Sequence, residues 1–141
     1  MTVAFAFVGG AAVTHAAQPT HINNAYHKLR RAHYVLEHSC RHLGGHRATA
    51  LKDVQAAVNE LKLAAETKHG ALPAVAESGS LRIKKGQVHP YIHDALRECK
   101  EAKSELTAAK HDFGGHRAKA LNHVNAAISQ LELAKSEPRC K

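Results

Sequence analysis

The chain has 141 residues, a formal net charge of +8, 13 histidines and no tryptophan. Few aromatic residues and abundant Ala, Leu, Lys and Glu are typical of helices that pack through small side chains, and they exclude a β-sandwich or barrel as the expected class. The length favours one domain. The positive charge attracts polyanions in general and does not by itself select nucleic acid, acidic lipid or anionic polysaccharide.

Residues 1–17 are predicted to be a signal peptide, because 3–13 are uncharged and apolar and small residues follow up to Ala17. This segment is shorter than the roughly 20 apolar residues that a membrane-spanning helix needs. The predicted location is therefore periplasmic or secreted, an oxidising setting that permits disulfides. The remainder, 18–141, is predicted to be the folded domain.

One unit occurs twice in the chain. The stretch Gly44–Ala48, Gly-Gly-His-Arg-Ala, returns seventy residues later as Gly114–Ala118. Between 44–64 and 114–134, 13 of 21 positions are identical. This similarity indicates an internal duplication.

Each copy begins with a predicted helix, at 21–43 in the first copy and from Pro90 to about 113 in the second. One row of positions in each advances by three and four residues, the spacing that lines one face of a helix. Proline is tolerated in a first helical turn. The rows are Ile22, Ala25, Leu29, Ala32, Leu36, Ser39 and Leu43, and Ile92, Ala95, Cys99, Ala102, Leu106, Ala109 and Phe113.

A second helix follows each Gly-Gly pair, because the same spacing resumes there. Its apolar positions are Leu51, Val54, Val58 and Leu61 in the first copy and Leu121, Val124, Ile128 and Leu131 in the second. The glycines supply the left-handed backbone that ends a helix and reverses the chain. The predicted fold is all-α, an antiparallel four-helix bundle built from two duplicated helical hairpins, 21–65 and 90–135.

The segment 66–89 has no clear period and is predicted to be a linker. A short path through it would give an up-down-up-down bundle with both Gly-Gly-His corners at one end. A path that crosses the bundle would put the corners at opposite ends, and the sequence allows both. The tail, 136–141, is predicted to fray.

The histidines of the first helix, His27, His33, His38 and His42, lie off the core row. His38 and His42 are four residues apart, a spacing that puts two imidazoles on one helical face, where they can chelate one divalent metal. A second pair, His89 and His93, repeats this spacing. In addition, His42 and His46 flank the first corner as His111 and His116 flank the second, with Asp112 beside the latter.

Imidazole suits Cu(II), Zn(II) and Ni(II), and it is mostly unprotonated at neutral pH. The predicted function is therefore the binding or buffering of divalent transition metal, with Cu or Zn as the expected ion. The candidate ligands are His38, His42, His46, His111, His116, Asp112, His89 and His93. Each histidine taken alone is equally compatible with an exposed or capping role, and a purely structural bundle with incidental histidines also accounts for the pattern.

An exported, duplicated helical hairpin with histidines along its polar flanks resembles the His-rich periplasmic four-helix bundles of the small metal-binding protein type. The resemblance covers 21–134 in overall style, without a diagnostic motif. It implies binding of copper and other divalent metals, and it transfers no individual ligand residue.

A second hypothesis is a basic structural or interaction module that binds an anionic polymer or membrane surface at the envelope. Its candidate residues are Arg30, Arg31, Arg82, Lys84 and Lys85. Binding of a specific nucleic acid is not predicted. We also expect no enzymatic activity, because no nucleophile has an evident base and no phosphate loop is present.

Haem is not predicted, because the chain lacks a Cys-x-x-Cys-His site and a core histidine. The paired carboxylate and histidine pattern of di-iron bundles is also missing. Of the three cysteines, Cys99 is predicted to pack in the core, and Cys140 could make an intermolecular link. A Cys40–Cys99 disulfide fits only corners at opposite ends, where the two residues would lie within about 6 Å in height at the rise of a helix.

Overall fold

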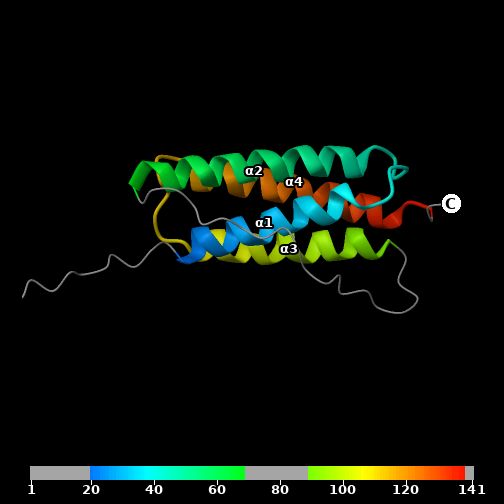
Figure 1. Ribbon diagram of the computed structural model, residues 1–141, viewed down its shortest axis with the longest axis horizontal. Coiled ribbons are helices and arrows are strands. Elements are labelled where there is room, and N and C mark those ends of the chain that lie inside the picture. The colour runs from blue at the N-terminus through cyan, green and yellow to red at the C-terminus, as the bar shows by residue number, and fades with distance from the viewer. Residues whose placement is uncertain (1–19, 69–88, 139–141) are drawn as a thin grey trace, which may run out of the picture.

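The computed structural model describes residues 20–68 and 89–138, and within them the chain forms four helices. These are α1 (Thr20–Glu37), α2 (His46–Lys68), α3 (Pro90–Ala108) and α4 (His116–Ser136). The predicted all-α bundle of two helical hairpins is confirmed (Figure 1). The predicted signal peptide, most of the predicted linker and the end of the tail lie outside the described residues.

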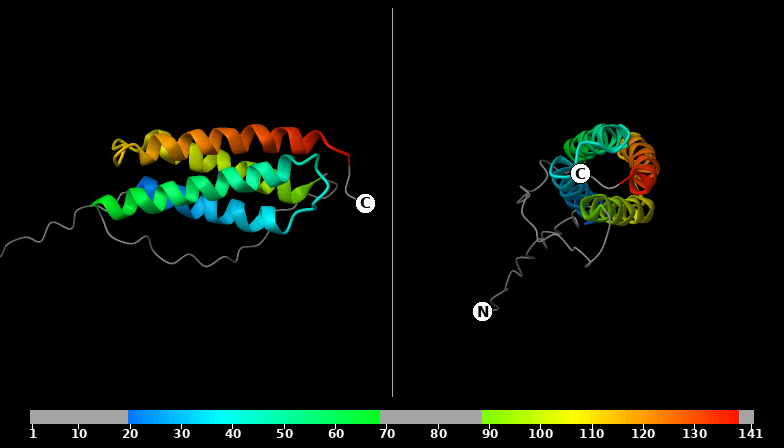
Figure 2. Two further views of the ribbon diagram at one scale, coloured as in Figure 1. Left: turned by 90° about the horizontal axis from the view of Figure 1, so that it is seen from above. Right: turned by 90° about the vertical axis from the view of Figure 1, so that its right-hand side faces the viewer.

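The helices stand side by side in a square when the bundle is viewed along its axis (Figure 2). Helix α1 packs against α3 and α2 against α4, while α1–α2 and α3–α4 are the two hairpins. His46 at the start of α2 contacts Gln130 near the end of α4, and His116 at the start of α4 contacts Glu60 in the second half of α2. The two glycine corners therefore lie at opposite ends of the bundle.

The end of α2 and the start of α3 also lie at opposite ends, since His89 contacts Glu137 beside the first corner. Of the two topologies that the sequence allows, the structure has the one in which the connection between hairpins spans the bundle. The twenty residues of 69–88 reach much farther than α2, which is roughly 35 Å long at 1.5 Å per residue. The long connection makes this arrangement possible.

The core is formed by the predicted rows of α1 and α3, all of which are buried, and by Val54, Val58, Leu61, Val124 and Leu131 of the other two helices. Many of the buried residues are alanines, which lets the helices approach closely. Leu51, Leu121 and Ile128 are only partly buried and pack against the edge of this core. The step of three and four residues thus identified the inner face of all four helices.

The first and third helices end earlier than predicted. Helix α1 ends at Glu37 and α3 at Ala108, rather than at 43 and 113. Arg47 donates to the carbonyl oxygens of Leu36 (2.8 Å) and Glu37 (3.0 Å), which an extended helix would have used internally. Leu43 and Phe113, beyond the ends, remain buried as predicted.

The glycine pairs adopt the predicted left-handed backbone, with φ of 58° and 81° at Gly44 and Gly45 and 69° and 91° at the second pair. In the second corner Phe113 is also left-handed, with φ of 51°. No helix among the described residues is long and apolar enough to cross a membrane.

Candidate functional site

The first corner does not bring the candidate ligands together as predicted. Because α1 ends at Glu37, His38 and His42 do not share a helical face, and both are exposed. The Nδ1 atom of His38 lies 2.7 Å from the carbonyl oxygen of Tyr34, and the two rings meet at an angle of 37° with their centres 4.2 Å apart. The predicted chelating pair of His38 and His42 is therefore wrong in its helical geometry.

His46 has the best-defined environment of the candidate ligands. Its Nδ1 atom lies 2.8 Å from Oε1 of Gln130 on α4. Its Nε2 atom lies 3.7 Å from Oε1 of Glu137, just beyond the end of α4. The backbone N–H of Glu137 also donates to the carbonyl oxygen of Ala134. Glu137 belongs to the segment 136–141 that was predicted to fray, and these contacts hold it against α4.

His89 and His93 also differ from the prediction. His89 precedes α3 in a left-handed conformation, with φ of 54°, and it is buried. Its Nε2 atom lies 2.9 Å from the backbone oxygen of Glu137, so the ring holds the end of α4 against the start of α3. The carbonyl oxygen of His89 accepts from the N–H of His93. His89 thus serves to join two helix ends rather than to pair with His93 on one face.

At the second corner the candidate residues have separate partners. His116 places Nδ1 2.7 Å from Oε2 of Glu60 on α2. Asp112 accepts from the N–H of Ala118 at 3.0 Å and thereby caps α4. His111 is exposed and its ring meets Phe113 edge-on. Asp112 is accordingly a cap, and the described contacts do not bring it to a shared site with His116.

Several other histidines are oriented in the same way as His46 and His116. His21 places Nδ1 2.6 Å from Glu105, and His123 places Nδ1 3.4 Å from Asp53. His33 faces Glu37 through Nδ1 at 3.5 Å, and burial lowers the pKa of its imidazole. Carboxylate and amide oxygens only accept, so Nδ1 carries the proton in these contacts and the lone pair of a neutral ring lies on Nε2. The sequence reasoning did not identify His21 or His123.

These contacts of the histidines do not form a complete metal centre. Within 20–68 and 89–138, no three His, Cys, Asp or Glu side chains are grouped closely enough to hold one ion. At His46, the Nε2 atom and the Glu137 carboxylate form a pair of possible metal donors 3.7 Å apart. This pair, with Gln130 orienting the imidazole, is the candidate site.

A cluster of charged residues that sequence reasoning missed lies between α1 and α3. Asp94 and Glu98 of α3 are buried, and Arg31 of α1 donates to both at 3.1 Å. Arg97 also bonds to both carboxylates. The spacing of four between Asp94 and Glu98 was the available signal, because it places two acids on one face opposite the basic α1.

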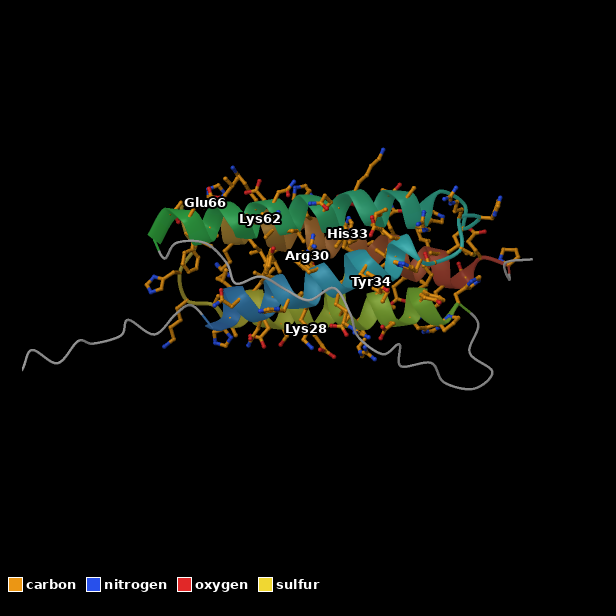
Figure 3. All side chains as sticks on the ribbon, in the orientation of Figure 1. Lys28, Arg30, His33, Tyr34, Lys62 and Glu66 are labelled. Carbon is orange, nitrogen blue, oxygen red and sulfur yellow. The ribbon has the colours of Figure 1, made fainter. Side chains whose placement is uncertain are left out.

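This cluster bears on the anion-binding hypothesis. Arg31, one of its candidates, has its guanidinium held by two buried carboxylates and is not presented to an external anion. Arg30 is half-buried along α1, beside His33 (Figure 3). Arg82, Lys84 and Lys85 lie outside the described residues. No observation on the described residues favours this hypothesis.

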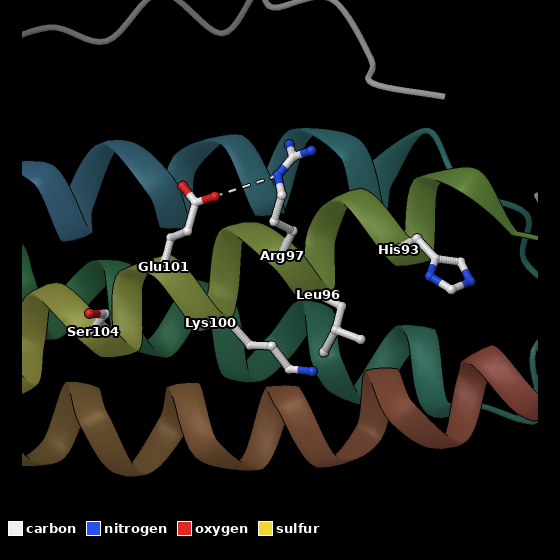
Figure 4. A pocket seen from close by; sticks show the side chains of 6 residues that line it. All are labelled: His93, Leu96, Arg97, Lys100, Glu101 and Ser104. Atoms are coloured by element: carbon white, nitrogen blue, oxygen red, sulfur yellow. Dashed lines mark ion pairs between the residues drawn. The ribbon is translucent and has the colours of Figure 1, made fainter. Parts of the chain in front are cut away.

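A shallow groove runs along α3, lined by His93, Leu96, Arg97, Lys100, Glu101 and Ser104. Arg97 and Glu101 form an ion pair beside α1, whereas Leu96 and Lys100 point toward α4 (Figure 4). Lys100 bonds to Glu132 of α4 at 2.7 Å. The cations of this groove are paired within the protein, so the groove is not a ready site for an anion.

The cysteines follow the prediction in part. Cys99 is free and fully buried, as predicted. Cys40 is disulfide-bonded, and Cys140 lies outside the described residues. A Cys40–Cys99 bridge does not form even though the corners are at opposite ends. The reason is that Cys99 lies between Asp94 and Glu105, which sets it level with the middle of α1 rather than with its end.

Comparison with known proteins finds no matching family model, no matching curated protein and no matching solved structure. Functional inference therefore depends on the geometry of this chain.

Proposed function

We propose that the protein binds divalent transition-metal ions, and that His46 and Glu137 are its principal ligands. The observation that carries the proposal is the position of the His46 imidazole. Its Nδ1 is fixed at 2.8 Å from Gln130, while its Nε2 lies 3.7 Å from a carboxylate oxygen of Glu137. An ion between Nε2 and that oxygen would have two protein donors of the kinds that Zn(II) and Cu(II) accept.

The hydrogen bond to Gln130 supports this role. Ligating histidines usually donate their other ring N–H to an oxygen acceptor, which fixes the tautomer and aims the lone pair at the metal. His46 has this arrangement before any ion is bound, so little reorganisation is needed. The His46 side chain is 27 % exposed and that of Glu137 is 32 % exposed, so water can complete the coordination.

Two protein donors give weaker binding than the four of a structural zinc site, and the ion exchanges more readily. Such a site suits buffering better than permanent retention. Other oriented imidazoles, on His21, His116 and His123, offer single Nε2 donors for additional, weaker binding. The proposed activity is therefore reversible uptake of Cu(II) or Zn(II), with the first corner as the site of highest affinity.

The test is calorimetric titration of the metal-free protein, without an affinity tag, by Cu(II) and Zn(II). His46→Ala and Glu137→Gln should each weaken the tightest binding step by tenfold or more. His27→Ala is the matched control, because His27 lies half-buried on α1 against Tyr26 and is not a candidate ligand. Its isotherm should follow that of the wild type.

A second variant addresses the histidine set as a whole. In it His38, His42, His46, His111 and His116 are all changed to Ala. Unchanged Cu(II) and Zn(II) binding in this variant would overturn the proposal. Binding should also weaken below about pH 6, as imidazoles protonate, and depend little on salt. A steep loss with salt would instead indicate the anion-binding module.

A further inference from the structure

Two contacts between the hairpins join residues that occupy equivalent positions in the repeat. Asp53 and His123 are 70 residues apart, the repeat length, and lie 3.4 Å apart across α2 and α4. Lys28 and Glu98 have the same separation in sequence and lie 3.7 Å apart across α1 and α3. A residue faces its own equivalent only on a two-fold axis, so both pairs mark the axis that relates the two hairpins.

The corner histidines show the same symmetry. His46 contacts Gln130, and His116 contacts Glu60, at 2.8 and 2.7 Å. His46 is equivalent to His116, and Glu60 is equivalent to Gln130, so the two contacts are symmetry copies of one interaction. The hairpins therefore associate as the two halves of a symmetric dimer would, although they belong to one chain.

The two residues of each pair on the axis occupy equivalent positions but differ in charge. If a hairpin paired with its own copy, each axis residue would face an identical residue, which for Lys28, Glu98 or Asp53 places like charges together. In the actual pairing each axis position brings a basic residue against an acidic one. Glu98 is the most sensitive of them, because its side chain is only 4 % exposed and Lys28 lies near its Oε2, which accepts no hydrogen bond. Like charges there would be poorly screened by solvent.

We propose that the surface between the hairpins is self-excluding: the hairpin 20–68 fits the hairpin 89–138 and rejects its own copy, and the reverse also holds. The partner that fits this surface is therefore the opposite hairpin, from the same chain or from a second copy. Two chains can associate through it only by exchanging hairpins, with every contact of the monomer retained. Opposite charge between α1 and α3, at Lys28 on the axis and at Arg31 beside it, determines the choice.

The experiment uses the full chain with a cysteine on the axis and a short bismaleimide cross-linker. Asp53→Cys combined with His123→Cys should cross-link within one chain, which reports the native pairing. Asp53→Cys alone should remain an uncrosslinked monomer after refolding at high concentration, because position 53 does not meet its own copy. Of the native cysteines in the described residues, Cys99 is buried and Cys40 is disulfide-bonded, and the chain without added cysteines, treated in the same way, gives the background of covalent dimer.

The charge determinant is tested by adding Lys28→Met to Asp53→Cys. Removing the Lys28 charge takes away the like-charge contact in a self-paired dimer, so the covalent dimer should increase several-fold. Lys62→Met, at an exposed site on α2, is the matched control and should leave the dimer fraction low. Abundant covalent dimer from Asp53→Cys alone would overturn self-exclusion, and an equal response to Lys28→Met and Lys62→Met would overturn the assignment of Lys28.

Discussion

The guanidinium of Arg47 donates to the backbone carbonyl of Leu36 at 2.8 Å, so a residue of the second helix terminates the first. Arg117 makes the same contact with Leu106 at 2.9 Å in the second copy. Both arginines belong to the repeated Gly-Gly-His-Arg sequence, and both reach back to the residue eleven positions earlier. The repeat has therefore preserved a helix-terminating contact together with the corner itself.

Arg47→Met should destabilise the protein by about 1–2 kcal/mol, because hydrogen bonds from a charged donor to the part-buried Leu36 carbonyl and to Ser39 are lost. Arg117→Met should cost less, since the Arg47 guanidinium also bonds to Ser39 and Glu37, whereas the Arg117 guanidinium bonds to Leu106 and otherwise forms a 3.6 Å ion pair with the exposed Asp112. Urea unfolding monitored by circular dichroism gives both values. Equal losses for the two variants would contradict this ranking.

Gly44→Ala and Gly45→Ala should both destabilise the first corner by roughly 1–2 kcal/mol, because both positions are left-handed. They should differ in metal binding. A Cβ at Gly44 would lie 2.8 Å from Oε1 of Glu137, whereas one at Gly45 has no atom within 4 Å. Gly44→Ala should displace that carboxylate and weaken Cu(II) binding several-fold, while Gly45→Ala leaves the affinity unchanged. Identical titrations for the two variants would argue against Glu137 as a ligand.

Cys99 should be inert in the folded protein. Burial, with a contribution from Glu98, raises the pKa of its thiol from 9.0 to about 12. A thiol reagent at neutral pH should therefore detect Cys99 only after denaturation. Reaction of Cys99 in the folded protein at the rate of an exposed thiol would contradict its burial.

The same thiol should make stability depend on pH in alkaline solution. Between pH 9 and about 12 the unfolded thiol loses its proton while the folded one retains it, so the free energy of unfolding falls as the pH rises. Cys99→Ala should remove this part of the dependence of the free energy of unfolding on pH and leave the part that comes from the lysines. The measurement is urea unfolding at successive pH values.

Glu132 should titrate at unusually low pH. Hydrogen bonds from Lys100 and Lys135 lower the pKa of its carboxyl from 4.5 to about 2. Its stabilising contribution is complete above pH 4.5 and is lost as the pH falls through 2. Carbon-13 NMR of the side-chain carboxyl should show this midpoint, and Lys100→Met should move it upward. A midpoint near 4.5 in the unaltered protein would exclude the ion pairs in solution.

The helices and their inner faces could be predicted from the sequence because burial follows a step of three and four residues, as at Leu29, Leu36 and Leu106. The helix ends could not, because the end of α1 depends on Arg47, which lies beyond the corner and outside the spacing pattern of α1. The sequence also did not determine whether the two corners lie at the same end of the bundle, since no pattern in 66–89 indicates the direction of the connection.

The partners of the histidines depend on that same topology. His46 meets Gln130 only if the corners lie at opposite ends, so a prediction based on spacing within one helix could not find it. The spacing within one helix predicted a pair of His38 and His42 instead. That pair requires α1 to continue to residue 42, but α1 ends at Glu37. Asp94 and Glu98 are buried because Arg31 and Arg97 pair with their carboxylates, and a pattern of apolar positions does not indicate such burial.

The placement of the corners at opposite ends also determines how bound charges would influence each other. Along α2, His46 and the Glu60 partner of His116 are separated by roughly 21 Å at 1.5 Å per residue. That is more than twice the Debye length of about 8 Å at physiological ionic strength. A cation held at one end would therefore be electrostatically screened from the other, and the two ends would fill independently, without cooperativity or competition.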